Sequence, residues 1–133
     1  MAKDFDRWNK RKKKVNARDE GVKFHEREIW WCSLGVNVGS EQDGINNNFE
    51  RPVVVIRNFN GRVLWIVPLT RTFKRYNPYY FPLQRDENGI SAAVVSQLRL
   101  IDSKRLIRKI RTLDDTQYRE LIYWITTLLK DYQ

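Results

Sequence analysis

The chain has 133 residues, of which 41% are hydrophobic and 13% aromatic, and this composition argues for one folded domain and against global disorder. Its single cysteine and single histidine exclude a disulfide framework, a multi-cysteine zinc site and catalytic arrangements with two imidazoles. The longest apolar runs fall far short of the roughly 18 residues of a membrane span and the N-terminal residues are charged, so we expect a cytoplasmic protein without membrane contact.

Charge is unevenly distributed along the chain, whose net charge is +9. Residues 28–50 carry four acidic and no basic side chains, whereas residues 51–85 carry seven basic and no acidic ones. The basic segment also contains several aromatic rings, and cations beside aromatic rings suit a polyphosphate whose bases can stack. Nucleic acid is therefore a candidate ligand, and a solvated basic surface is the alternative.

Residues 1–26 form a basic N-terminal extension, and residues 27–133 are expected to form the main domain. Within the extension, Phe5, Trp8 and Val15 lie near helical spacing, which predicts a short amphipathic helix. A frayed basic tail is the alternative.

Five strand-like segments follow, at residues 28–34, 52–56, 62–69, 79–83 and 91–100. Asn-Gly pairs at 60–61 and 88–89 predict hairpin turns. Two polar loops, 37–50 and 70–78, interrupt the strands, and long ordered loops in small domains often carry function.

The last part of the chain changes to a helical period. Asp102 or Ser103 predicts the cap of a short helix that runs through Lys109, and Asp114 or Asp115 predicts the start of a longer helix. The longer helix has an apolar stripe of Leu121, Ile122, Ile125, Leu128 and Leu129. Together the segments predict a mainly β, α+β fold: a small, partly open β-barrel with a packed helix.

Four segments, in their order and spacing, resemble the signature segments of MazF/PemK-family toxins. They are Gly39-Ser40-Glu41-Gln42, Arg51-Pro52-Val53-Val54-Val55-Ile56, Val67-Pro68-Leu69-Thr70 and the stretch from Val95 to Leu106. With Ile29-Trp30-Trp31 before them, the resemblance runs from about Glu28 to Leu129. It implies a CcdB/PemK-type SH3-like barrel, a homodimer, and a metal-independent endoribonuclease toxin of a type II toxin–antitoxin system that cleaves single-stranded RNA and needs no cofactor. It also implies a cognate antitoxin with an acidic, disordered segment. The toxin would contact DNA only indirectly, through this antitoxin.

RNA cleavage without a metal uses the 2′-hydroxyl as nucleophile and leaves a 2′,3′-cyclic phosphate and a 5′-hydroxyl. Negative charge gathers on the phosphoryl oxygens, so a rigid guanidinium aimed at them is the most useful group. The resemblance assigns this role to Arg51 and places the second catalytic residue at Thr70, whose hydroxyl can donate to a phosphoryl oxygen. Glu41 is the third catalytic candidate, either orienting Arg51 or accepting a proton; a solvated loop glutamate is the alternative.

Residues around these three are expected to bind RNA. The loop after Thr70 would form the substrate wall, with lysine and arginine on phosphates and a tyrosine stacked on a base. Strand alternation predicts that Gln97 and Arg99 share one face of the last strand. The RNA-binding candidates are Gln42, Arg71, Lys74, Arg75, Tyr80, Gln97 and Arg99.

Two segments depart from the usual family pattern. The polar stretch 43–50 is longer than the linker that many relatives have before the Arg-Pro pair, and it is expected to alter access to the site or to clamp RNA. The N-terminal extension lies outside the minimal family domain.

An inactive relative that only binds RNA or an antitoxin is the main alternative function, because the basic loop would serve it equally well. A gyrase poison of the CcdB type shares the fold, and fold alone does not fix function. Those proteins end in a tail with a tryptophan, whereas residues 129–133 here contain none, which disfavours this reading.

Overall fold

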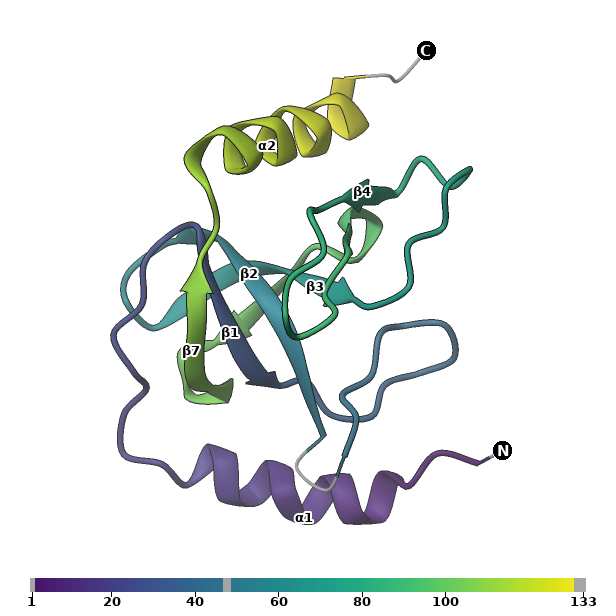
Figure 1. Cartoon of the computed structure of the whole chain (residues 1–133). Helices are drawn as coiled ribbons and strands as arrows, with labels where there is room; N and C mark the ends of the chain where they lie inside the picture. Colours follow the sequence, from purple (N-terminus) through teal and green to yellow (C-terminus); the bar gives the residue numbers. More distant parts are fainter. Residues whose placement is uncertain (1, 47–48, 131–133) are drawn as a thin grey trace.

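The computed structural model describes residues 2–46 and 49–130 (Figure 1). Residues 47 and 48 of the predicted 37–50 loop and residues 131–133 at the C-terminus lie outside the described part. The helices and strands, in chain order, are α1 (Phe5–Asn16), β1 (Glu28–Ser33), β2 (Glu50–Asn58), β3 (Val63–Thr70), β4 (Tyr80–Pro82), β5 (Ala92–Val94), β6 (Arg99–Asp102), β7 (Leu106–Thr112) and α2 (Asp115–Lys130). Two single-turn 3-10 helices, η1 (Val95–Gln97) and η2 (Ser103–Arg105), flank β6.

The strands form one antiparallel sheet in the order β4-β5-β3-β2-β1-β7, with β6 also paired to β3. β3 is the centre of this arrangement. One of its edges pairs with β2, and the other is divided between β6 at Val63–Ile66 and β5 at Leu69–Thr70. The sheet curls without closing, and the mainly β, α+β fold predicted from the sequence is confirmed.

Alternation along β2 places apolar residues in two separate clusters. Val53 and Val55 enter the cluster enclosed by the curled strands, whereas Val54 and Ile56 face the other cluster. α2 covers that second cluster with its buried Leu121 and Ile125. Both faces of the central strands are therefore buried, and each fully buried side chain of this kind contributes about 1.5–3 kcal/mol.

The N-terminal extension contains the predicted helix, α1, which packs on the opposite side of the sheet from α2 (Figure 1). Its buried Trp8 lies in a third small cluster with Val36 and Phe49. Gly35 is required beneath it, since its φ is +84° and an added Cβ would lie 2.1 Å from the Trp8 ring. None of the helices in the described part of the chain is long and apolar enough to cross a membrane.

The predicted short helix up to Lys109 is wrong. The capping signal does act, because the Asp102 carboxylate accepts a hydrogen bond from the Lys104 amide at 2.8 Å, but only η2 forms there. From Leu106 the chain becomes β7 and pairs with the edge of β1. A β-branched, half-buried segment fits that edge, and long-range pairing overrides the local helix signal.

The predicted strand 91–100 is also wrong as one element. It is divided into β5 and β6 by η1, because the two halves pair with different parts of β3. Gln97 ends η1 and Arg99 begins β6, so the two residues do not share one strand face as alternation predicted.

Candidate active site

Arg51 and Thr70 line one pocket at the edge of the sheet. Arg51 is the second residue of β2 and Thr70 the last residue of β3, and antiparallel pairing brings the start of one strand beside the end of the other. Arg71 continues the polar rim. The pocket has a volume of about 150 Å³, and its apolar wall consists of Trp31, Ile45, Pro52, Leu69 and Ile90.

The half-buried Arg51 side chain is held by two backbone carbonyl groups. Its Nε donates to the Asp43 oxygen at 2.5 Å, and its Nη1 donates to the Leu69 oxygen at 3.1 Å. Burial lowers the pKa of Arg51 below its ordinary value, and the opposing effects of the nearby Asp43 carboxylate and Tyr80 hydroxyl are smaller. A guanidinium stays protonated under these influences, so the site holds a fixed positive charge with a set orientation.

The Thr70 hydroxyl is fixed at the pocket rim. Its Oγ1 accepts a hydrogen bond from the Thr72 amide at 3.2 Å, and its backbone carbonyl accepts one from the Ser91 amide at 2.9 Å. The accepted bond at Oγ1 uses a lone pair, so the hydroxyl hydrogen can be donated to a ligand. Arg51 and Thr70 thus offer two donor groups to one small volume.

Trp31 is a pocket residue that the sequence reasoning did not select. The Arg108 guanidinium lies 5.2 Å from the centre of its ring, and Arg108 is paired at 3.2 Å with the buried carboxylate of Glu50. The ring therefore has a cation over it that is itself paired with a buried carboxylate. The Trp30-Trp31 pair in the sequence could have indicated this position. Neighbours in a strand point to opposite faces, so when Trp30 lies in the enclosed cluster, Trp31 faces outward.

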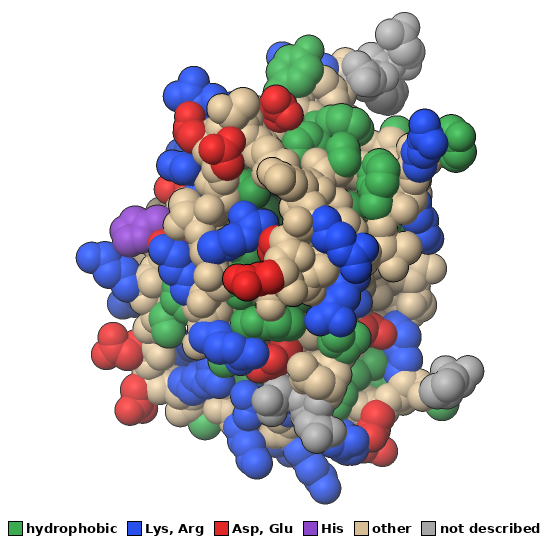
Figure 2. Space-filling view, viewed as in Figure 1, with side chains coloured by type: hydrophobic (Ala, Val, Ile, Leu, Met, Phe, Trp, Pro, Cys, Tyr) green, Lys and Arg blue, Asp and Glu red, His purple; other side chains and the backbone are tan. Residues whose placement is uncertain are grey.

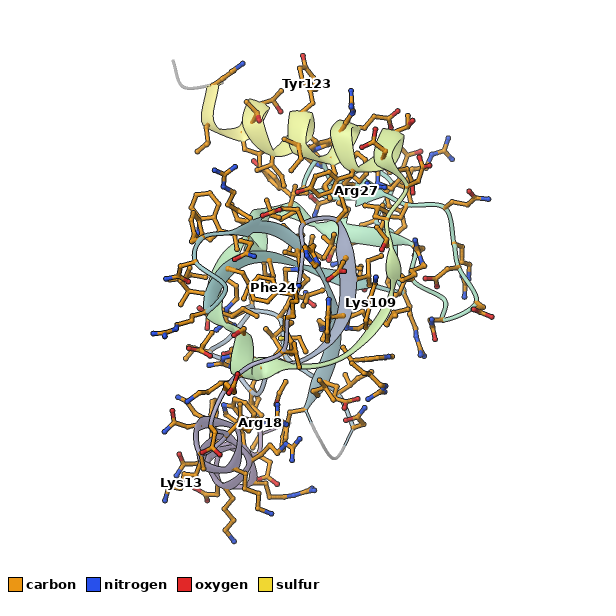
Figure 3. All side chains as sticks on the ribbon, turned by 90° about the vertical axis from the view of Figure 1, so that its left-hand side faces the viewer. Lys13, Arg18, Phe24, Arg27, Lys109 and Tyr123 are labelled. Atoms are coloured by element: carbon orange, nitrogen blue, oxygen red, sulfur yellow. The ribbon has the colours of Figure 1, made fainter. Side chains whose placement is uncertain are left out.

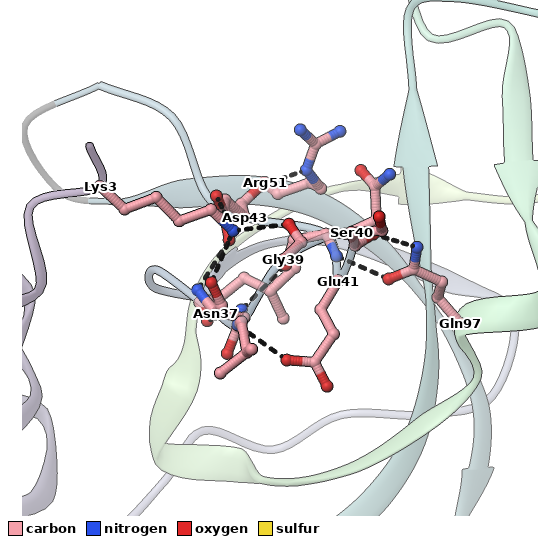
Figure 4. A network of polar contacts seen from close by, with 11 residues as sticks. Lys3, Asn37, Gly39, Ser40, Glu41, Asp43, Arg51 and Gln97 are labelled. Carbon is pink, nitrogen blue, oxygen red and sulfur yellow. Dashed lines mark hydrogen bonds and ion pairs between the residues drawn. The ribbon is translucent and has the colours of Figure 1, made fainter. Parts of the chain in front are cut away.

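The loop of residues 37–43, called the signature loop here because it contains the first signature segment, lies beside Arg51 and is fastened by Gln97 (Figure 4). The Gln97 Oε1 accepts from the Gln42 amide at 2.6 Å, and its Nε2 donates to the Ser40 carbonyl oxygen at 3.0 Å. The structure thus brings Gln42 and Gln97 together, and it uses both ends of the Gln97 amide to hold the loop.

Glu41 is not brought to the Arg51 pocket. Its Oε1 accepts a hydrogen bond from the Val38 amide at 2.9 Å, and Figure 4 shows its carboxylate turned away from the Arg51 guanidinium. Glu41, Gln97 and Arg99 instead line a separate open hollow of about 600 Å³. The catalytic assignment of Glu41 stays a prediction.

The basic loop between β3 and β4 forms a third hollow, of about 670 Å³, which Lys74 and Arg75 line with exposed side chains. The Lys74 Nζ lies 5.4 Å from the centre of the Tyr80 ring. Tyr80 is the first residue of β4, directly after this loop. Lys and Arg side chains extend over the middle and lower parts of the face in Figure 2.

Comparison with known families and structures gives one family and one fold. The model of the PemK-like, MazF-like toxin of type II toxin–antitoxin systems matches residues 25–129. Comparison with curated proteins by sequence finds no match.

Three solved structures illustrate the structural likeness. MazF from Deinococcus radiodurans is 19% identical, with 84% of this chain and 99% of that chain covered and a TM-score of 0.66. An endoribonuclease from a mycobacterial species, in complex with its cognate antitoxin, is 12% identical, with 81% and 96% covered and a TM-score of 0.61. The Mycobacterium tuberculosis toxin MazF-mt6 is 19% identical, with 80% and 100% covered and a TM-score of 0.60. At these identities the likeness establishes the fold.

Proposed function

Because this chain belongs to the PemK-like, MazF-like toxin family of type II toxin–antitoxin systems, we propose that it is a metal-independent, sequence-selective endoribonuclease toxin that cleaves single-stranded RNA. The observation that carries the proposal is the meeting of Arg51 and Thr70 in one pocket with an apolar wall. A guanidinium and a hydroxyl suit a phosphate group, and an apolar wall containing an indole ring suits the face of a nucleobase.

In the proposed reaction the 2′-hydroxyl oxygen attacks the adjacent phosphorus and the bond from phosphorus to O5′ breaks. The 2′-hydroxyl proton passes to a base, and the departing O5′ takes up a proton, which leaves a cyclic phosphate and a 5′-hydroxyl. Arg51 donates to the phosphoryl oxygens that gain charge in the transition state, and Thr70 donates to the same group. Because two carbonyl groups already hold Arg51, it reorganises little as that charge develops.

The proposed reaction needs a group near the Arg51 pocket that accepts the 2′-hydroxyl proton. Glu41 is the candidate, and its carboxylate would have to leave the Val38 amide and turn toward the Arg51 pocket. Glu41→Gln tests it. A base role predicts a fall in kcat and loss of the acidic limb of the pH–rate profile, whereas a loop-fastening role leaves that profile unchanged.

The RNA strand would continue beyond the pocket. Arg71, Lys74 and Arg75 would meet phosphates, with Tyr80 stacked on a base. Gln42, Gln97 and Arg99 would contact the strand at the hollow beside the signature loop.

The proposed partners are a second copy of the chain and a cognate antitoxin, which would also provide the contact with DNA. Support comes from two similar solved structures, a MazE–MazF complex from Deinococcus radiodurans and a mycobacterial endoribonuclease in complex with its cognate antitoxin. An acidic antitoxin segment suits the basic loop that would otherwise meet RNA.

Incubation of the purified protein with long unstructured RNA in excess EDTA tests the function, with the product ends mapped. Discrete cuts with cyclic-phosphate and 5′-hydroxyl ends are expected. Arg51→Ala is expected to lower cleavage by about 10²–10³-fold, and circular dichroism checks that the variant keeps its fold, since two carbonyl groups lose their donor. Arg57→Ala is the matched control, because Arg57 is an exposed arginine of the same strand.

Intact RNA with a folded, antitoxin-free preparation would contradict the enzyme proposal and favour a non-catalytic RNA or antitoxin binder. Cleavage at the parent rate by Arg51→Ala would leave the family intact but remove the catalytic assignment of Arg51.

A further inference from the structure

The N-terminal segment reaches the signature loop through one side chain, that of Lys3. Its Nζ donates to the Asn37 carbonyl oxygen at 2.5 Å and to the Gly39 carbonyl oxygen at 2.9 Å. It also lies 3.0 Å from Oδ2 of the Asp43 carboxylate. An ammonium group has three donors, and these three acceptors come from both ends of the same loop (Figure 4).

Lys3 is presented to the loop by a helix that is anchored along its length. Asp4 caps α1 by accepting from the Arg7 amide at 3.0 Å, and Trp8 is buried 5.6 Å from the Phe49 ring. At the far end, Arg18 donates to the Lys104 carbonyl oxygen at 2.6 Å. Figure 3 shows Arg18 between α1 and the body of the protein, so the helix forms a fixed base for Lys3.

The loop transmits this contact to Arg51. Asp43 uses its carboxylate for Lys3 and for the Asn37 amide, at 3.0 Å and 2.7 Å, and its backbone oxygen for Arg51. The Asp43 carboxylate is only 28% exposed, so solvent weakens its pairing with Lys3 less than it would weaken a fully exposed pair. The position of the oxygen that holds the Arg51 guanidinium therefore depends on a side chain 40 residues before it in the sequence.

We propose that Lys3 is a positioning residue for Arg51: it holds residues 37–43 in the conformation that orients the guanidinium toward the pocket. Residues 1–24 lie outside the family match, so this chain supports its site with a segment of its own. The kinetic consequence rests on the proposed function, whereas the structural consequence does not.

Lys3→Met tests the proposal, because it keeps the aliphatic stem and removes the ammonium group. Lys13→Met is the matched control, since Lys13 is exposed on the outer side of the same helix (Figure 3) and its loss changes the net charge equally. With an RNA oligonucleotide that spans a mapped cut, Lys3→Met is expected to lower kcat about tenfold with little change in KM. Lys13→Met is expected to keep the parent kcat, and Lys3→Arg is expected to restore much of it.

The second readout is the NMR resonance of the Arg51 Nε–H group, assigned by its loss in Arg51→Lys. In the parent and in Lys13→Met it is expected to exchange slowly with water, whereas in Lys3→Met it is expected to shift and exchange faster. Asp43→Asn is expected to have the same effect, and the double variant with Lys3→Met is expected to add little further.

An unchanged Arg51 resonance in Lys3→Met would overturn the proposal, as would an equal fall in kcat in Lys3→Met and Lys13→Met, which would indicate a general charge effect. If the parent cleaves no RNA, the proposed function fails and the Arg51 resonance alone decides whether Lys3 positions that side chain.

Discussion

At the scale of single residues, the site combines a fixed cation with a fixed ring. Arg51 is held by two carbonyl groups on one side of the pocket, and Trp31 is backed by Arg108 and the buried Glu50 on another. Both side chains already have contacts that restrict their orientation before a ligand binds. Such preorganisation lowers the entropic cost of binding and of catalysis.

Replacement of Trp31 separates binding from catalysis. Trp31→Ala is expected to raise KM by about 5–150-fold, because base–aromatic stacking contributes about 1–3 kcal/mol, and to change kcat less. Trp31→Phe is expected to keep most of the affinity since it keeps a ring. Steady-state kinetics on an oligonucleotide substrate measures both, and a fall in kcat at constant KM would contradict the stacking role.

The buried Glu28 carboxylate makes the free energy of unfolding depend on pH in the acidic range. Burial raises its pKa, but hydrogen bonds from the His25 amide, Trp30 Nε1 and Lys109 outweigh burial, and the net pKa lies below its ordinary value. A lowered pKa in the folded state contributes stability above the unfolded-state pKa, which is lost as pH falls through the folded value.

The free energy of unfolding is therefore expected to decline below about pH 4.5, and to decline less in Glu28→Gln than in the parent. Urea unfolding between pH 3 and pH 7 measures this. Glu87→Gln, at an exposed position, is the control and is expected to follow the parent. Parallel curves for Glu28→Gln and the parent would show that another group carries the acid sensitivity.

At the scale of elements, the packing of α1 against the sheet depends on the backbone conformation of Gly35. Gly35 lies two residues after the end of β1 with a positive φ, directly beneath the Trp8 ring, and the Arg105 guanidinium lies 5.7 Å from the centre of that ring. A helix of 12 residues is marginal by itself in water, so this docking maintains α1 and with it the place of Lys3.

A comparison of two glycines tests this docking. Gly35→Ala and Gly61→Ala both place a Cβ at positive φ, +84° and +78°, but only the first meets another atom within 4 Å. Gly35→Ala is expected to be the more destabilising by about 1–3 kcal/mol, the cost of displacing a packed group. Denaturant unfolding and the far-UV circular dichroism of α1 measure it, and equal effects would mean that backbone strain alone explains both.

At the scale of the whole molecule, the basic surface near the pocket is expected to control RNA affinity. KM is expected to rise steeply with salt, and Lys74→Ala is expected to lower the slope of log KM against log salt by about 0.7, the value for one phosphate contact on a single strand. Lys23→Ala is the control because it removes an exposed charge from the segment before β1. An identical slope in the parent and in Lys74→Ala would remove Lys74 from the binding surface.

The sequence by itself determined the fold class, the family and the helix in the N-terminal extension. These depend on signals that are local: alternation in the strands, the spacing of Phe5, Trp8 and Val15, and four signature segments in order. It also predicted Arg51 and Thr70 as partners, and the structure places them in one pocket because β2 and β3 pair antiparallel.

Tertiary structure alone decided which edges pair and what faces the pocket. The segment predicted as a helix up to Lys109 became β7 because the edge of β1 was available for pairing. The predicted strand 91–100 was divided because its two halves, β5 and β6, pair with different parts of β3. Trp31 in the pocket wall and Lys3 on the signature loop follow from contacts between distant segments. Local periodicity and capping cannot specify such contacts, since they depend on which surfaces remain unpaired once the core has formed.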